Sequence, residues 1–408
     1  MARAARSTRT PRVLTDGEPT PEVDRLDGIL HPRMNPSLIG HAEAEAALAS
    51  AFASGRMHHA WLLSGTEGIG KATLAYRLAR FALQAGGAGY GASGDASGLF
   101  GSDDTPGDLT LEASLEAPSA RQVMALSHPG LLVLRRQWDA KRKKFATMIT
   151  VDEVRRLRGF LSLSTSDGGW RVVIVDRADE MNVNAANALL KALEEPPARC
   201  LFLLIASEPG RLPVTVLSRC RRLGMSPLDR TALEDAYRHV AQLSAFDAEG
   251  VEDWALLHRL AGGSVRRALL LTREDGLTLY DELIKLLGTL PKLDWPNVQG
   301  FAESLAPVAQ DTRYTLALDL LGDMIVRLVH AGADGRAEAA AEGEAASREH
   351  AIAARVAPPG SLAPWSELWE RLARDRAEVR LLNLDRQNFL LSVFQEIEAA
   401  ALAGAEAA

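Results

Sequence analysis

Apolar residues follow two different patterns along this chain, and the change from one to the other falls near Pro227. Before that point, short continuous apolar runs alternate with segments of helical periodicity. The runs are Ala60–Leu63, Leu131–Leu134, Val172–Val175 and Leu201–Ile205. Continuous runs of this length are typical of parallel strands that are buried on both faces. The pattern therefore predicts an α/β domain with a parallel sheet.

Beyond Pro227 the strand pattern stops, and apolar residues recur at spacings of three and four, as on the buried side of a helix. Two such series are Leu318, Leu321, Ile325, Leu328 and Trp365, Leu368, Trp369, Leu372. A wider apolar stripe near the end holds Phe389, Leu390, Val393, Phe394 and Ile397. That stripe fits either the core of a helical bundle or a subunit interface. The C-terminal part is therefore predicted to be all-α.

Three segments show neither pattern, and their polar or small-residue composition is typical of flexible chain. We expect a flexible N-terminal arm over 1–33, a flexible Gly/Ser/Ala/Asp-rich insertion over 84–118 and a flexible Ala/Glu/Gly-rich linker over 331–349. The predicted domains are an α/β domain (34–226), a small helical lid (227–282) and a helical domain (283–408).

Length and charge narrow the class of protein. The 408 residues suffice for two or three domains, and the net charge of -7 argues against a chain that grips nucleic acid along its whole surface. The two cysteines, Cys200 and Cys220, form no C-x-x-C pair and predict neither a disulfide framework nor a zinc site. With no signal-peptide pattern and no apolar run of about 18 residues, we expect a cytoplasmic protein without membrane contact.

The segment Ser64 to Arg80, SGTEGIGKATLAYRLAR, contains most of a phosphate-binding loop. Gly65, Gly70 and Lys71 stand where G-x-x-x-x-G-K-[ST] requires them, and a predicted strand precedes the loop. The position of the magnesium-binding hydroxyl is Ala72. Thr73 follows, but one helical position rotates a side chain by roughly 100°, so Thr73 does not replace the missing ligand directly.

A second site is expected in RVVIVDRADEMN, where Asp176 follows a buried strand and could hold magnesium. In active ATPases the next residue is usually a glutamate that polarises the attacking water. Here that position is Arg177, and a cation cannot act as a general base. Glu180 is expected to be a surface or capping residue rather than a displaced base. Together, Ala72 and Arg177 predict no appreciable ATP hydrolysis, and the loop is kept either for weak nucleotide binding or for its turn geometry alone.

The stretch NVNAANALLKALEEPP, with VDRAD before it and VLSRC after it, closely resembles the δ′ family of bacterial DNA polymerase III clamp loader subunits, which belong to the AAA+ superfamily. The resemblance covers most of Leu38 to Leu270. It implies a RecA-like AAA+ domain, a small helical lid and a helical collar that holds a five-subunit ring together. The implied partners are the γ/τ motor subunits, δ, the sliding clamp and primer–template DNA, met through the assembled complex.

The same resemblance implies roles for two arginines. Arg219, in SRC, matches the arginine finger that completes the ATP site of a neighbouring subunit, although chemistry alone would make it a surface charge. Arg266 matches a lid arginine that senses phosphates, or it merely solvates a lid helix. The cofactor-binding set is then Gly65, Gly70, Lys71, Thr73, Asp176 and Arg266, at a degenerate site that requires no cofactor and binds ATP weakly, if at all.

Three further points complete the interpretation. The insertion lacks the four cysteines with which many relatives bind zinc, so we expect no metal. The basic run Lys141 to Lys144 can be either a DNA contact or a solvated face. The competing function is an active ATPase of the motor-subunit type, which Ala72 and Arg177 disfavour; a P-loop kinase or GTPase would explain neither SRC nor the all-helical C-terminal third.

Overall fold

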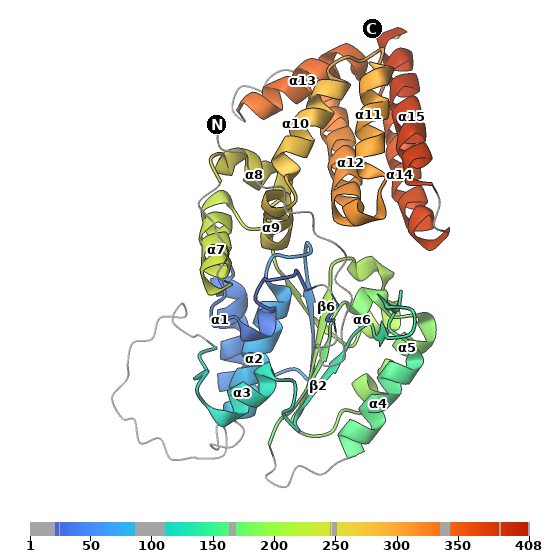
Figure 1. Ribbon diagram of the computed structural model, residues 1–408. Coiled ribbons are helices and arrows are strands. Elements are labelled where there is room, and N and C mark those ends of the chain that lie inside the picture. The colour runs from blue at the N-terminus through green and yellow to red at the C-terminus, as the bar shows by residue number, and fades with distance from the viewer. Residues whose placement is uncertain are drawn as a thin grey trace. The chain divides into compact units, whose positions relative to one another are not determined.

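The computed structural model shows a chain of two compact units (Figure 1). One comprises residues 21–246 together with Ala261–Arg267, and the other comprises Val251–Leu260 and residues 268–406. The residues that the structure describes are 21–23, 25–85, 111–162, 169–244, 246, 251–334, 343–382 and 385–406. Over these residues the first unit is α/β and the second is helical.

Five parallel strands form the sheet of the α/β unit, in the order β2-β5-β6-β1-β7. Their bounds are β1 (Ala60–Ser64), β2 (Leu131–Leu134), β5 (Arg171–Val175), β6 (Cys200–Ala206) and β7 (Arg221–Gly224). The four predicted strands are thus confirmed. The apolar pattern does not predict β7, whose sequence is RRLG, because this edge strand is exposed at three of its four positions and needs no apolar run.

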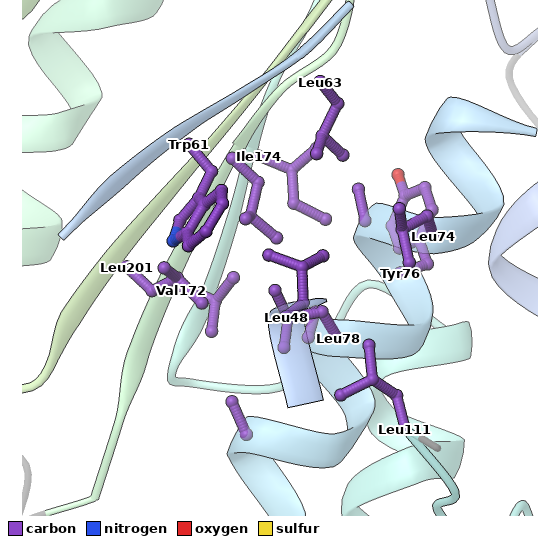
Figure 2. Packing of buried hydrophobic residues seen from close by; sticks show 14 of the residues in the cluster. Leu48, Trp61, Leu63, Leu74, Tyr76, Leu78, Leu111, Val172, Ile174 and Leu201 are labelled. Carbon is purple, nitrogen blue, oxygen red and sulfur yellow. The ribbon is translucent and has the colours of Figure 1, made fainter. Parts of the chain in front are cut away.

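Helices cover both faces of the sheet (Figure 1). On one face lie α1 (Ala42–Ala53), α2 (Lys71–Ala85) and α3 (Pro118–Met124), and on the other lie α4 (Val151–Ser162), α5 (Val183–Glu194) and α6 (Val214–Leu217). Figure 2 shows Trp61 of β1 packed in one core with Leu48 and Leu78, whereas Leu62 belongs to the core of the opposite face. Burial on both faces is the physical reason for the continuous apolar runs.

Short elements complete the α/β unit. They are η1 (Pro32–Met34), β3 (Trp138–Asp139), β4 (Lys144–Phe145), η2 (Ala178–Glu180), η3 (Pro209–Arg211) and α7 (Arg230–Leu243). β3 and β4 form an antiparallel pair, so the basic run Lys141 to Lys144 occupies the turn and second strand of a hairpin. α7 begins after Asp229, whose side chain accepts a hydrogen bond from the Ala232 amide at 2.8 Å and caps the helix.

The helical unit is built from helices with buried apolar side chains, two of which begin or end within Ala261–Arg267 of the α/β unit. Their bounds are α8 (Trp254–Ala261), α9 (Val265–Arg273), α10 (Gly276–Leu287), α11 (Trp295–Leu305), η4 (Val308–Gln310), α12 (Asp311–Asp334), α13 (Glu344–Val356), α14 (Ala363–Leu382) and α15 (Arg386–Glu406). Trp365 and Phe394 are fully buried, and the Phe301 and Phe394 rings meet edge to face at 6.0 Å. The C-terminal stripe is therefore bundle core, whereas Trp369, expected in the same stripe as Trp365, is 45% exposed.

Parts of the three segments that were expected to be flexible have defined structure. Within the N-terminal arm, residues 21–23 and 25–33 are packed: Val23, Ile29 and His31 are buried, and Glu22 forms ion pairs with Arg33 (2.6 Å) and Arg135 (3.1 Å). Composition alone could not show these distant partners. The rest of the arm, residues 1–20 and 24, lies outside the described residues.

The predicted insertion (84–118) and the predicted linker (331–349) also contain residues with defined structure. Residues 84–85 end α2, Leu111 is only 1% exposed, and α3 begins at Pro118, whereas 86–110 lie outside the described residues. The prediction of a linker over 331–349 is wrong at both ends, because α12 runs to Asp334 and α13 begins at Glu344; 335–342 lie outside the described residues. Apolar positions on these helix ends are few, so composition concealed them.

The boundary predicted between lid and C-terminal domain, at 282/283, falls inside α10. Residues 251–260 and 268–282 belong to the helical unit, and only 227–246 and 261–267 of the expected lid belong to the α/β unit. A division by sequence order cannot reproduce this, since the two units exchange the chain more than once.

Candidate functional site

Three segments of the α/β unit meet at the carboxyl edge of its sheet. β1 runs into the loop Gly65–Gly70 and then into α2, β5 runs into Asp176 and Arg177, and β6 runs into Ser207. Because β6 lies between β1 and β5, these three strand ends are neighbours. Ligands of open parallel sheets bind at this edge, and the fold brings the loop Gly65–Gly70, Lys71 and Asp176 to it.

The loop keeps glycine where its backbone requires it. Gly65 has a φ of +148°, and a Cβ atom there would lie 2.2 Å from the Met225 carbonyl oxygen. Gly68 has a φ of +79°, and a Cβ there would lie 2.4 Å from both Ser264 Oγ and Arg266 Cβ. Gly70, with a φ of +119°, directly precedes α2. These glycines serve the turn and its close packing whether or not a nucleotide binds.

The Lys71 ammonium group is already engaged by the chain. Its Nζ donates to the Gly65 carbonyl (2.6 Å), the Thr66 carbonyl (2.6 Å) and Ser207 Oγ (3.1 Å), and the side chain is buried. Burial lowers the pKa of Lys71 to about 8, against the opposing effect of neighbouring carboxylates, Glu67 first among them. A nucleotide phosphate would have to compete with all three acceptors.

The metal-binding half of the site does not fit a magnesium–nucleotide complex. Ala72 packs against the hydrophobic core, Thr73 is buried on α2, and Asp176 is the one predicted magnesium ligand directly after a strand. Over the described residues, no cluster of three or more His, Cys, Asp or Glu side chains could hold a metal ion. With a carboxylate but no hydroxyl at position 72, the donor set for the ion is incomplete.

At the position of the catalytic base lies Arg177, which forms an ion pair with Glu67 of the loop. Arg177 adopts a left-handed backbone conformation (φ 64°), which is uncommon for a residue other than glycine. Its Nε lies 2.9 Å from Glu180 Oε1, and its Nη1 lies 3.4 Å from Glu67 Oε1. Arg266 of α9 joins the group, with Nε 3.2 Å from the same Glu67 oxygen.

The sequence analysis did not identify Glu67 as a site residue and did not predict the burial and ion pairing of Glu180. Glu180 is paired with Arg136 (2.7 Å) as well as Arg177, and only 15% of its side chain is exposed, so it is neither a surface residue nor free to act as a base. The signal for Glu67 was present: an acidic residue inside the loop, in a chain with an arginine at the base position. Its partners, however, are 110 and 199 positions away.

Comparisons with known proteins point to one family. A family model described as DNA polymerase III, delta subunit, matches residues 102–229. DNA polymerase III subunit delta′ of Escherichia coli is 30% identical over 279 residues, which cover 67% of this chain and 73% of that protein. The delta′ of Pseudomonas aeruginosa is 38% identical over 162 residues, or 40% and 41% of the two chains. The chain belongs to the AAA+ family of DNA polymerase III clamp loader subunits.

Clamp loader subunits named tau and gamma match as well. DNA polymerase III subunit tau of Salmonella typhimurium is 30% identical over 264 residues, which cover 64% of this chain but only 36% of tau. A solved γ-subunit-related protein from Thermotoga maritima aligns with 88% of this chain and 99% of its own, at 14% identity and a TM-score of 0.40.

In this clamp loader protein, Arg219 lies apart from the other predicted site residues. It precedes β7 by two residues, and β7 pairs in parallel with β1 so that Arg221 is opposite Trp61. Arg219 is therefore near the amino ends of these strands, whereas the phosphate loop follows the carboxyl end of β1. Its side chain is 34% exposed, and its guanidinium donates to the Thr215 carbonyl (2.8 Å) and pairs with Glu194 (2.8 Å).

The basic run Lys141 to Lys144, predicted as either a DNA contact or a solvated face, lies in the hairpin β3–β4. The hairpin is held by an edge-to-face contact of Trp138 with Phe145, with ring centroids 5.0 Å apart, and the side chains of 141–144 are exposed.

Both cysteines are buried and unpaired, and burial raises the pKa of each to about 11. In the described part of the chain, no helix is long and apolar enough to cross a membrane.

Proposed function

We propose that this clamp loader family member is of the δ′ type: a scaffold without ATP turnover of its own that helps to place a sliding clamp on primed DNA. It works in the cytoplasm with γ/τ motor subunits and δ, meets the clamp and primer–template DNA through the assembled complex, and needs neither zinc nor bound ATP. It acts as part of the DNA-directed DNA polymerase III holoenzyme and supplies Arg219 to a neighbouring motor subunit.

The observation that carries this proposal is the ion-paired Arg177 where an active ATPase has its water-polarising carboxylate. A guanidinium cannot accept a proton, and its pairing with Glu180 and Glu67 holds it at the site. Ala72 independently removes a magnesium ligand, and Lys71 is hydrogen bonded to its own loop. Three defects in metal, water and phosphate contacts support a site that has lost hydrolysis.

The second candidate is an active motor subunit, and it is favoured by the similarity to tau and gamma proteins. The two candidates differ in one measurable property. The purified chain should show no appreciable ATP hydrolysis if it is a scaffold, and the same preparation should contain no stoichiometric zinc. Turnover on the order of 1 per second by a contaminant-free sample, within the ordinary range of such enzymes, would establish the motor instead.

The position of Arg219 at the amino edge of the sheet supports a role outside the chain's own site. An arginine finger contributes roughly 10³ to 10⁵ to the rate at a single site. In a ring with several motor sites, the ATP sites that are completed by other subunits remain active. Arg219→Ala should therefore give an intact complex with a partial loss of clamp- and DNA-stimulated ATPase activity and a larger loss of clamp loading. Arg219→Lys should behave similarly, because an ammonium lacks the planar fork.

The matched control is Arg222→Ala, which removes an exposed arginine three residues away in β7. Each variant is reconstituted with γ/τ and δ subunits, the stoichiometry is checked by size exclusion, and ATPase and clamp loading are measured side by side. The finger assignment is withdrawn if the Arg219→Ala complex assembles and matches the wild type and the Arg222→Ala complex in both assays.

A further inference from the structure

Glu67 brings a carboxylate into the phosphate loop at a point where cations converge. Its Oε1 lies 3.4 Å from Arg177 Nη1 and 3.2 Å from Arg266 Nε, and its charge also acts on Lys71, where it opposes the lowering of the ammonium pKa. A phosphate loop otherwise presents amides and cations to its ligand. Here part of the positive charge that would attract an anion is neutralised from within the loop.

The cations around Glu67 come from three separate segments: Lys71 opens α2, Arg177 follows β5, and Arg266 lies on α9. A carboxylate and a terminal phosphate offer such donors the same kind of acceptor, an anionic oxygen. Glu67 is tethered beside them, so it occupies the position without the loss of translational freedom that a free anion suffers on binding. The backbone amide of Arg266 also lies 3.4 Å from the Gly68 carbonyl oxygen, next to Glu67.

We propose that Glu67 is the resident anion of this site and determines its ligand specificity: its carboxylate stands where the terminal phosphate of a nucleoside triphosphate would lie, and it keeps triphosphates out of the native chain. The proposal deepens the proposed function and rests on it, since it explains how a chain that turns over no ATP keeps a formed phosphate loop. Removing this carboxylate turns the loop into an anion-binding site.

The size of the effect follows from the neighbouring charges. Glu180 stays paired with Arg177 and Arg136, and Asp179 stays bound to the Ser207 and Glu208 amides at 2.8 and 2.7 Å, whatever happens at position 67. Among the described residues Glu67 makes two ion pairs, which its removal releases, and 44% of its side-chain surface is exposed. Two partly exposed pairs correspond to roughly a tenfold change in a binding constant.

The test uses the full chain and inorganic triphosphate, with ATP as a second probe, in magnesium-free buffer of low ionic strength. Binding is measured by titration calorimetry for the wild type, Glu67→Gln and Glu67→Ala. The matched control is Glu116→Gln, which removes another glutamate of the α/β unit from an exposed pair with Arg121. Thermal melting confirms that each variant is folded.

We expect both Glu67 variants to bind triphosphate about tenfold more tightly than the wild type and the Glu116→Gln control, and we expect Arg266→Ala in the Glu67→Gln background to cancel the gain. Equal affinities for wild type and Glu67→Gln overturn the proposal, as does a gain that survives Arg266→Ala. Either result leaves the proposed function intact if the wild type turns over no ATP. Turnover by the wild type removes the proposed function, whatever the Glu67 variants bind.

Discussion

Glu349 of α13 is a buried carboxylate that ties four helices of the helical unit together. Its side chain is 1% exposed, and its oxygens lie 2.7 Å from Arg259 Nη2 on α8 and 2.9 Å from Arg327 Nε on α12. The Tyr280 hydroxyl of α10 donates to it at 2.8 Å. Glu349→Gln keeps the shape and an acceptor for Tyr280 but removes the charge that both arginines need.

Removing one partner of a buried ion pair costs about 3 to 5 kcal/mol, because the other charge stays buried without compensation. Arg259 and Arg327 keep 18% and 19% of their side-chain surface in water, which relieves part of that cost. We therefore expect Glu349→Gln to lower the stability of the helical unit by about 3 kcal/mol. Glu349→Ala should cost more, since the Tyr280 hydroxyl also loses its acceptor.

The effect should depend on pH in a defined direction. Burial alone would raise the pKa of Glu349, but the charge of Arg327, with the hydrogen bonds from Arg327, Arg259 and Tyr280, outweighs burial and lowers the pKa below 4.5. A carboxyl whose pKa is lowered on folding contributes stability above its unfolded pKa and loses it as pH falls through the folded one. The difference between wild type and Glu349→Gln should thus be full at pH 7 and shrink below about pH 4.5.

Amide hydrogen exchange is the suitable assay, because a global melt of a two-unit chain is not a two-state transition. Peptides from α12 and α13 should exchange roughly 100-fold faster in Glu349→Gln at pH 7, the equivalent of about 3 kcal/mol. The control is Glu344→Gln in the first turn of α13, where an 80% exposed carboxylate pairs with Arg348, and exchange should change less than about fivefold. Exchange rates within threefold of the wild type for Glu349→Gln would refute the reasoning.

Two further predictions concern the α/β unit. Gly65→Ala should destabilise the α/β unit by about 2 kcal/mol or more, since the new Cβ would lie 2.2 Å from the Met225 carbonyl oxygen. The control Gly159→Ala, with no atom within 4 Å of the new methyl group, should stabilise it slightly. An unchanged melting temperature for Gly65→Ala would contradict the geometry. Leu189→Ala should cost about 2 to 5 kcal/mol, measured by amide hydrogen exchange of α5 peptides, because Leu189 is fully buried in α5. Val183→Ala, at a 71% exposed position of the same helix, should cost little, and equal costs would show that the helix does not pack as described.

The strands of the sheet were predictable to the extent that burial shaped their sequence. β1, β2, β5 and β6 are covered on both faces, so their buried positions are apolar and form continuous runs, and the polar residues Ser64 and Arg171 lie at strand ends. β7 lies at the edge with its arginines exposed, and the hairpin β3–β4 has only two residues in each strand. Elements that bury little apolar surface leave little trace in the sequence.

Segment boundaries were less predictable because composition reports the average character of a stretch and not its contacts. Residues near Glu22 read as flexible chain until Arg33 and Arg135 are seen to hold that carboxylate. Leu111 read as part of an insertion, although its side chain is buried and its amide donates to Glu45 at 3.0 Å. Such contacts join residues that are far apart in the chain, and no local pattern encodes them.

For the candidate site, the sequence by itself determined what depends on residue identity: glycines in a tight loop, no hydroxyl at Ala72, and a cation in place of a base at Arg177. Only the tertiary structure decided which charges meet. It placed Glu67 between Arg177 and Arg266, turned the Lys71 ammonium onto its own loop, and put Arg219 near the opposite edge of the sheet from that loop. The reason is physical: backbone conformation and the chemistry of a side chain are local properties, whereas ion pairing depends on distances that exist only once separate segments have packed together.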